Sequence, residues 1–439
     1  MTADLDVPAG SATSSGLRPF LATLTFHAFG LGILILVFSF GPYSSASSAL
    51  DVAVTVALFS APALILMPLS SGLIRRFPPR QLGVVILLIN FVLFLSLAIC
   101  TEIYGESLTL LFVAAGLTGV FYVAMFDPAW SNLIRTAVPP EQLSDVNSRV
   151  VSVQGAGQVA GLLAGGLLLS VIGYSGLFLI CAISMLPLAW AIARMPMKGA
   201  SSLAEPRESS SLRVALREVW ASKLMRSSFV LMGVLIFTAW PLMVLLPSVS
   251  GYIFPSSQLA LAFLMAMFFI GSSLAFPMIK RGVNALKVSA ERHPWNRRLL
   301  PLVSIAIALL ALTAHVEPAL LGLVLTGLVL VPAGLLLGVI GVMTLSLVQR
   351  EISPASAAIV LTVYVIVVQV GTSVGSLTAA AVTDSVGVFI VLPAIGALGL
   401  IAAIVTIRSR YLVAVNDMAA EAFVPPELMP KLGSQPEQA

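Results

Sequence analysis

The chain has 439 residues, of which 59% are hydrophobic and 10% are charged, whereas soluble domains are about 45–50% apolar and about 25% charged. With a mean hydropathy of +1.04, this composition excludes an ordinary water-soluble protein and indicates that lipid covers much of the surface. The net charge of +4 does not indicate nucleic-acid binding, because the basic residues fall between hydrophobic stretches rather than along one face.

Hydrophobic stretches long enough to cross a bilayer follow one another along the whole chain. The first, Phe20 to Phe40, is too long for a signal peptide and lacks a small-residue cleavage site, so we interpret it as a span. The predicted spans lie near residues 20–41, 51–73, 81–101, 107–134, 147–171, 174–194, 226–249, 257–280, 299–316, 319–348, 354–382 and 386–408. We therefore predict an all-α integral membrane protein with twelve transmembrane helices.

The basic residues mark one side of the membrane. If the amino terminus is cytoplasmic, no outward loop contains Lys or Arg, and all 23 basic residues lie on the inner side. Those outward loops are 42–50, 102–106, 172–173, 250–256, 317–318 and 383–385. The positive-inside rule thus predicts a multi-pass protein of the inner (plasma) membrane with both termini in the cytoplasm.

A long hydrophilic segment divides the spans into six and six. The predicted parts are an N-terminal tail (1–19), a first bundle (20–195), a cytoplasmic linker (196–225), a second bundle (226–408) and a C-terminal tail (409–439). Within the linker, residues 211–223 have the pattern of an amphipathic helix on the membrane surface. An ordinary solvated linker is the alternative.

An internal repeat relates the two predicted bundles. A shift of 214 positions places residues 135–173 on 349–387 without a gap. It aligns Pro140 with Pro354, Gly157 with Gly371, Gly161 with Gly375 and Gly173 with Gly387. Because the matches fall at the same place in each set of six spans, we predict two pseudo-symmetric six-helix bundles, an arrangement found in secondary transporters.

The fifth span carries small residues every fourth position, in Gly157-Gln-Val-Ala-Gly161-Leu-Leu-Ala-Gly165-Gly166. This spacing places glycines along one helical face, where another backbone can approach closely. The segment resembles the glycine motif of antiporters in the major facilitator superfamily, with Leu162 in place of the motif's proline. The resemblance implies export by exchange, and plain helix packing is the alternative.

A second segment supports this resemblance. Gly119-Val-Phe-Tyr-Val-Ala-Met-Phe-Asp-Pro-Ala-Trp130, with Leu133-Ile-Arg-Thr-Ala-Val-Pro-Pro-Glu-Gln-Leu-Ser-Asp-Val-Asn147, looks like the connection between spans four and five in the enterobactin-exporter-like drug-efflux branch. With the twelve-span plan, the resemblance covers nearly the whole chain.

The loop after the second span, Ser71-Gly72-Leu73-Ile74-Arg75-Arg76-Phe77-Pro78-Pro79-Arg80, resembles the superfamily's glycine, acidic and basic loop signature. Arg75 stands where the family has Asp, and Pro78 where it has Gly, so the acid that would pair with neighbouring helix ends is absent. Arg75, Arg76 and Arg80 either belong to this conformational motif or serve only as positive-inside anchors.

Ionisable residues inside a membrane are costly and mark functional sites. Asp127 is the clearest one, and we predict that it couples transport to protons; the alternative is that it reaches the inner membrane interface or pairs with a neighbouring cation such as Arg135. His27 is the second candidate, with a hydrogen-bonded packing histidine as its alternative. Asp51, Glu102 and Asp384 are predicted to lie at span ends near the outer surface.

Few polar residues are available to line a cavity between the bundles. Such a sparse set suits an amphipathic or hydrophobic organic substrate better than a sugar. The predicted substrate-binding residues are Tyr122, Gln154, Gln158, Trp240, Tyr364 and Gln369. Trp240-Pro241 and Pro247 are expected to break the seventh span.

We thus predict a proton-coupled secondary exporter that works by alternating access and is not an enzyme; an importer or a lysophospholipid flippase is the alternative. Its expected partners are a small-molecule substrate, protons and membrane lipids, without nucleic acid, cofactor or metal, and we expect a monomer. Gly371-Thr-Ser-Val-Gly375 fits a serine-hydrolase pattern. A nucleophile is not expected there, because the pattern lies inside a predicted helix rather than at a strand-to-helix turn.

Overall fold

The computed structural model describes residues 12–46, 48–126, 129–130, 133–134, 143–195, 212–286, 295–351 and 357–408, and every regular element in these ranges is a helix. The first half contains α1 (Ala12–Ala46), α2 (Ala49–Arg76), α3 (Pro79–Tyr104), α4 (Leu108–Thr118), η1 (Gly119–Phe126) and α6 (Leu143–Arg194). The second half contains α7 (Leu212–Ala221), α8 (Lys223–Ala239), α9 (Pro241–Ile253), α10 (Gln258–Leu286), α11 (Trp295–Thr313), α12 (Ala319–Glu351), α13 (Ala357–Val386) and α14 (Val388–Arg408).

The long apolar segments are helical because a helix satisfies its own backbone hydrogen bonds inside hydrocarbon. Among the described residues, 8 helical stretches are long and apolar enough to cross a membrane. One of them, Arg149–Arg194, turns at Gly173 and covers two predicted spans. Shorter apolar helices lie at three further predicted spans: Ala49–Pro62, Pro301–Thr313 and Val388–Ala402. The helices follow the predicted order, and the count of twelve crossings remains a prediction.

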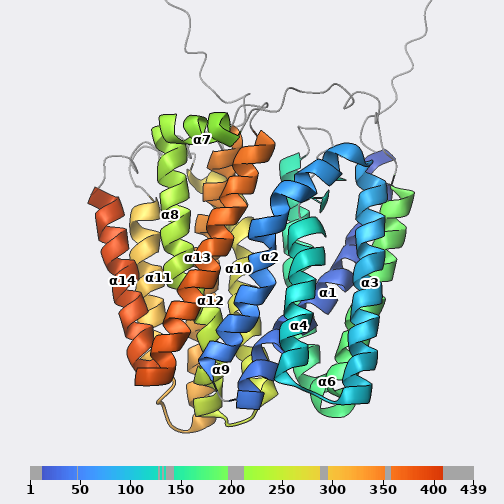
Figure 1. Cartoon of the computed structure of the whole chain (residues 1–439). Helices are drawn as coiled ribbons and strands as arrows, with labels where there is room; N and C mark the ends of the chain where they lie inside the picture. Colours follow the sequence, from blue (N-terminus) through green and yellow to red (C-terminus); the bar gives the residue numbers. More distant parts are fainter. Residues whose placement is uncertain are drawn as a thin grey trace, which may run out of the picture.

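The helices stand side by side along one direction, except α7, which lies across the upper end (Figure 1). In the first half α6 packs on α1 and α3, and in the second half α10 packs on α12 and α11 on α14. Each half is built around its own buried apolar cluster, with Phe94 and Phe178 in one and Leu245 and Leu264 in the other. The structure is therefore an all-α membrane fold with two helical cores.

Two helix pairs join the halves, namely α2 with α13 and α6 with α10. The shift of 214 residues places the first part of α6 on α13, and α2 and α10 are each the second predicted span of their half. The α2–α13 and α6–α10 pairs are therefore pseudo-symmetric copies of the same helix–helix contact. This arrangement is what the repeat predicts for pseudo-symmetric halves.

The aligned glycines at the end of the repeat lie at equivalent turns. Gly173 has φ of 63° between the two parts of α6, and Gly387 has φ of 91° between α13 and α14. A residue with a Cβ atom rarely adopts such a conformation, whereas glycine does so without steric cost. The same backbone requirement therefore explains why glycine stands at both positions.

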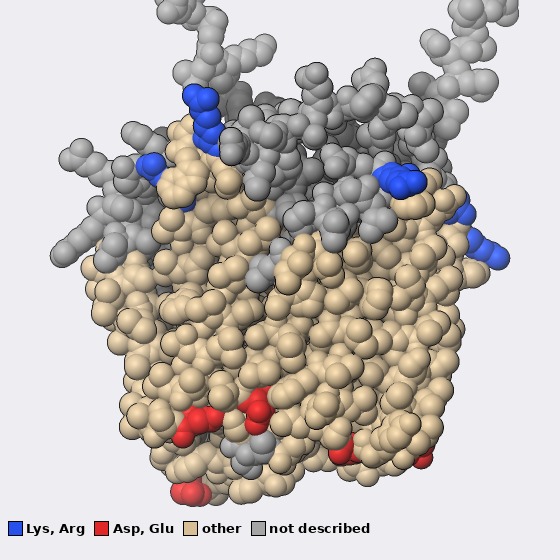
Figure 2. Space-filling model, viewed as in Figure 1, with Lys and Arg blue, Asp and Glu red and all other residues tan. Residues whose placement is uncertain are grey.

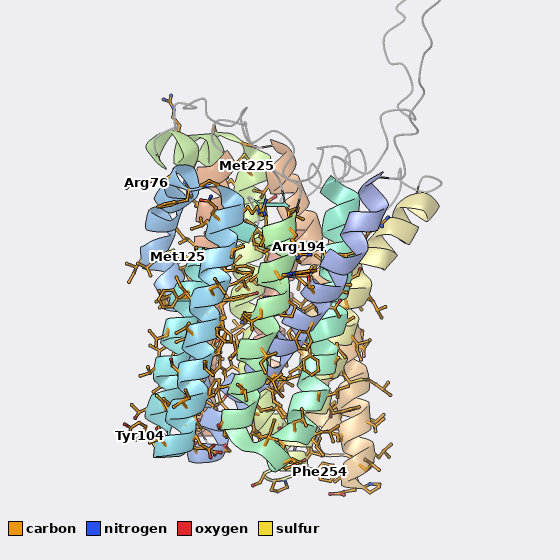
Figure 3. The ribbon with its side chains drawn as sticks, turned by 90° about the vertical axis from the view of Figure 1, so that its right-hand side faces the viewer. Arg76, Tyr104, Met125, Arg194, Met225 and Phe254 are labelled. Atoms are coloured by element: carbon orange, nitrogen blue, oxygen red, sulfur yellow. The ribbon has the colours of Figure 1, made fainter. Side chains whose placement is uncertain are left out.

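Charge divides the molecule into two ends. In Figure 2, Lys and Arg lie toward the top and Asp and Glu toward the bottom. Helix α2 has the same polarity, with Asp51 in its first turn and Arg76 as its last residue. Figure 3 places Arg76 at the upper end and Tyr104 and Phe254 at the lower end. We call the upper end the basic end and the lower end the acidic end.

Helix α7 lies within the predicted linker and contacts α8. Val219 is buried, whereas Arg217 and Trp220 are exposed. This division of apolar and polar sides favours the amphipathic-helix interpretation of the segment over a solvated linker. The preceding linker residues, 196–211, lie outside the described residues.

The fourth predicted span contains a widened helix that the sequence analysis did not predict. Helix α4 ends at Thr118 and continues directly as the π-helix η1. Pro128 follows two residues after η1 in the sequence, and a proline has no N–H for the carbonyl four residues before it. The proline is thus a local signal for this widening. Single π-turns often occur at functional sites.

Candidate transport site

The first half contains a buried pair of polar side chains. His27 of α1 is fully buried, and its Nε2 atom lies 3.2 Å from the Tyr122 hydroxyl of η1. The two rings are stacked with centroids 5.8 Å apart. The structure thus brings together one residue predicted for proton coupling and one predicted for substrate binding. The second ring nitrogen, Nδ1, has no hydrogen-bond partner among the described residues.

Aromatic rings continue from this pair along the side of α1. Phe126 contacts His27 and Tyr122 at centroid distances of 5.7 and 5.2 Å. The ring centroid of Trp130 lies 5.9 Å from that of Phe126 and 5.6 Å from that of Phe20. The surroundings of His27 are therefore apolar, and the Tyr122 hydroxyl is the polar group that meets its ring. The pair fits both interpretations of His27, because a packing histidine also needs such a bond.

The other predicted coupling residue, Asp127, lies outside the described residues, as does Pro128. The π-helix η1 ends at Phe126, the residue before it. Asp127 is thus adjacent in sequence to the element that carries Tyr122.

Two predicted glutamines lie on α6, which contacts α1 in its own half and α10 in the other. Gln158 of α6 is three residues after Gly155, which lies against Ser273 of α10, and four before Leu162, which belongs to the second half's buried cluster. Residues three and four apart share a helical face, so Gln158 lies at the border between the face toward α10 and the face toward α1, where its backbone lies against Gly32. Gln154 is three residues before Gly157, which lies against α1, and is therefore on the face toward α1. Both side chains are half-buried.

Gln369 lies on the corresponding face of α13. It follows Val365 and Ile366 by four and three residues, and both of these pack against the first half's buried cluster. Gln369 is half-buried on α13. Gln158 and Gln369 therefore lie near the two contacts between the halves, on α6 and α13, and hydropathy alone could not orient these helices.

The remaining predicted substrate residues lie elsewhere. Tyr364 of α13 is buried against Phe229 of α8 in an edge-on ring contact of 5.6 Å, and its hydroxyl has no partner in the described part of the chain. Trp240 is 36% exposed at the break between α8 and α9. The break occurs before Pro241 as expected, whereas Pro247 lies inside α9 without interrupting it.

The glycines of the fifth span form two faces rather than one. A Cβ atom at Gly157 would lie 2.8 Å from Ala28, and one at Gly165 would lie 3.2 Å from Leu36, both on α1. Gly161 is also on this face, where added atoms would meet the Phe29 carbonyl. Gly166 points instead to α10, where a Cβ atom would lie 2.7 Å from Ala262. The motif thus serves packing within one half and between halves.

The predicted loop arginines lie at the basic end. Arg76 is the last residue of α2, Arg80 lies in the first turn of α3, and both side chains are exposed. The side chain of Arg75 lies outside the described residues.

Sequence reasoning missed Asn90, which is fully buried on α3. Its amide donates to the carbonyl groups of Ile86 at 2.9 Å and Phe121 at 3.4 Å, the latter in η1. An amide inside the apolar stretch 81–101 was the available signal, because polar residues in spans often have a function. Asn90 thus ties α3 to the widened helix.

Ser373, the centre of the hydrolase-like pattern, is buried in the middle of α13. A nucleophile elbow requires a sharp turn between a strand and a helix, and the backbone here is continuous helix. The fold and this position point to a transporter rather than an enzyme.

Two helical cores joined by pseudo-symmetric helix pairs are the arrangement of a multi-pass secondary transporter. The model of the Major Facilitator Superfamily matches residues 14–376. The chain belongs to this superfamily. No curated protein matches the chain.

Among solved structures, a bacterial homolog of the human lysosomal transporter Spinster, crystallised in an inward-facing and unoccupied conformation, is similar to this chain. The TM-score is 0.58 at 17% sequence identity, and the match covers 93% of this chain and 97% of that chain. At this identity the likeness shows the fold.

Proposed function

We propose that the protein is a proton-coupled exporter of a small amphipathic or hydrophobic organic molecule. The observation that carries this proposal is the composition of α6 and α13 near the contacts between the halves. They present Gln154, Gln158 and Gln369 among apolar neighbours such as Leu162 and Ile366. A few polar groups orient a ligand, while an apolar surround favours a ligand that is itself largely apolar.

Export by exchange is supported by the glycine face of α6 and by the efflux-branch resemblance of residues 119–147. The charge polarity of the two ends supports an inner-membrane orientation with the basic end in the cytoplasm. In this orientation both termini and the linker are cytoplasmic. Substrate would leave through the acidic end.

We assign proton coupling to Asp127, with His27 and Tyr122 as the neighbouring polar pair. The π-helix η1 lies directly before Asp127, and helix widening there gives side chains room to exchange partners. Buried carboxyl groups that face a protein interior act as proton relays in pumps and transporters.

Uptake, or flipping of a lysophospholipid, is the second candidate. The same apolar faces that suit a hydrophobic drug also suit an acyl chain, and the fold is shared with the Spinster homolog. The direction of substrate movement and the substrate panel separate these candidates.

The test uses purified full-length protein in proteoliposomes with an imposed pH gradient. A lipophilic cationic dye, a catecholate siderophore and a lysophospholipid serve as probes. Substrate movement against its gradient toward the acidic end, driven by protons, supports export. Movement of the lysophospholipid alone, or movement toward the basic end, would transfer support to the second candidate.

The coupling assignment is tested with Asp127→Asn, which keeps the size of the side chain but removes titration. We expect the variant to reach the membrane and to retain substrate counterflow while losing accumulation driven by the pH gradient. Asp51→Asn, at the acidic end, is the matched control and should retain gradient-driven transport. Full gradient-driven transport by Asp127→Asn would contradict the assignment and leave His27, or a mechanism without protons, as the next candidate.

A further inference from the structure

A single carboxylate joins the two halves at the acidic end. Asp384, in the last turn of α13, accepts hydrogen bonds from the Ser48 hydroxyl at 2.7 Å and from the backbone N–H groups of Ala49 at 2.9 Å and Leu50 at 3.1 Å. Ser48 precedes α2, and Ala49 and Leu50 are its first two residues. The second half thus caps the start of a helix in the first half.

The bonds have a clear physical basis. The first N–H groups of a helix have no partner within the helix, and the positive end of the helix dipole favours a carboxylate. A charged acceptor makes these bonds stronger than bonds between neutral groups. Asp384 and Leu50 are exposed, whereas Ala49 is buried, so water reaches the carboxylate and replaces the bonds when the halves separate. The contact therefore stabilises the closed state of the acidic end and can still break reversibly.

The pseudo-symmetric position lacks this contact. The 214-residue shift places Asp384 on Ser170, whose hydroxyl donates to the Leu167 carbonyl of its own helix at 3.0 Å. The start of α10 is capped by its own Ser257, which accepts from the Ala260 N–H at 3.2 Å. The charged contact between halves is therefore not a consequence of the repeat.

Close packing accompanies the bond at the same end. A Cβ atom at Gly251 of α9 would lie 2.8 Å from the Tyr43 hydroxyl of α1. Val52 and Ala53 of α2 belong to the buried cluster of the second half. At the basic end, by contrast, the loop Ser71 to Arg80 contains no acidic residue that could make an equivalent bond.

We propose that Asp384 is a gating residue that stabilises the closed state of the acidic end. Its three bonds hold the start of α2 against α13, and they must break each time this end opens during the transport cycle. The inference goes beyond the proposed function, because it depends on neither the substrate nor the coupling ion.

The test measures the separation of the halves at the acidic end. The full-length protein, with Cys100→Ala and Cys181→Ala, carries spin labels at Glu106→Cys in the first half and Glu317→Cys in the second, both exposed positions. Pulsed electron double resonance in nanodiscs gives the populations of short and long distances. We expect Asp384→Ala to lower the ratio of short to long distances by about tenfold, because the variant loses all three bonds and water replaces part of what they contribute.

Two further variants make the result specific. Leu50→Pro keeps Asp384 and removes one donor, the Leu50 N–H, which is shared between Asp384 and the Ser48 hydroxyl directly before the same helix, each at 3.1 Å. Proline is tolerated in a first helical turn, so we expect a smaller shift in the same direction. Glu102→Ala removes an exposed acid of α3 at the same end and should leave the distances unchanged. If Asp384→Ala fails to fold, as judged by size-exclusion chromatography, Leu50→Pro decides the matter.

Unchanged distances in the folded Asp384→Ala and Leu50→Pro variants would overturn the proposal. An equal shift in Glu102→Ala would also overturn it, because a general loss of negative charge would then explain the opening. The measurement needs no substrate and no pH gradient. Failure of the export assay therefore leaves the gating role standing, and failure of the gating role leaves the proposed function standing.

Discussion

Two buried polar side chains of the first half meet the widened helix η1. The His27 ring contacts the Tyr122 hydroxyl, and the Asn90 amide donates to the Phe121 carbonyl. His27 Nδ1 and Asn90 Oδ1 have no hydrogen-bond partner in the part of the chain that the structure describes. A buried polar atom without a partner costs about 1–3 kcal/mol. These two atoms are therefore a cost to stability at the place where η1 packs on α1 and α3.

Tyr122→Phe should destabilise the protein by about 1–3 kcal/mol, because the buried His27 Nε2 then loses its hydroxyl partner. Thermal unfolding of the detergent-solubilised protein measures this change. Tyr104→Phe is the matched control, since Tyr104 is 81% exposed, and its effect should stay within about 0.5 kcal/mol. Equal stabilities of the two variants would show that the contact between the Tyr122 hydroxyl and His27 does not contribute to the free energy of unfolding.

At the scale of elements, α6 connects three parts of the molecule. Its glycines Gly157, Gly161 and Gly165 face α1, whereas Gly155 and Gly166 face α10 in the other half. Lipid offers little hydrophobic drive for helices to associate, so close backbone approach supplies much of the attraction. The same helix thus holds the first half together and forms the surface on which the halves move.

Gly161→Leu should destabilise the protein by about 3 kcal/mol and stall transport, because the added side chain collides with the Phe29 carbonyl of α1. Thermal unfolding and substrate counterflow measure the two effects. Gly116→Leu in α4 is the control, because a Cβ atom there meets nothing within 4 Å. Unchanged transport and stability in Gly161→Leu would show that the glycine face has no role in packing.

At the scale of the whole molecule, the charged side chains are distributed along the same axis as the helices. In the view of Figure 2, Lys and Arg lie toward one end and Asp and Glu toward the other, and α7 lies across the basic end (Figure 1). Because anionic lipid and the insertion process retain basic loops in the cytoplasm, this axis predicts how the protein sits in the inner membrane.

Both termini and the linker should therefore be cytoplasmic. A tag inserted at residue 210 should be accessible only after the inner membrane is made permeable, and a tag in the 250–256 loop should be accessible in spheroplasts. Reporter fusions at the same positions give an independent readout. External access at residue 210 would contradict the orientation and, with it, the outward direction of export.

The sequence alone determined the membrane class, the order of the spans and the glycine turns. These features depend on local properties, since hydrocarbon thickness sets the span length and a positive φ requires glycine at Gly173 and Gly387. The family resemblance of residues 119–173 also identified the superfamily. Placement of the polar side chains could be predicted only in part, because hydropathy does not specify how each helix is rotated about its axis.

Only the tertiary structure decided which residues meet. His27 and Tyr122 are 95 positions apart, and Ser48 and Asp384 are 336 positions apart. The sequence analysis treated Asp384 as a span end, whereas the structure places its carboxylate on the first turn of a helix from the other half. Such contacts depend on how the helices pack and on which faces they bury, which arises from the assembled bundles rather than from any one segment.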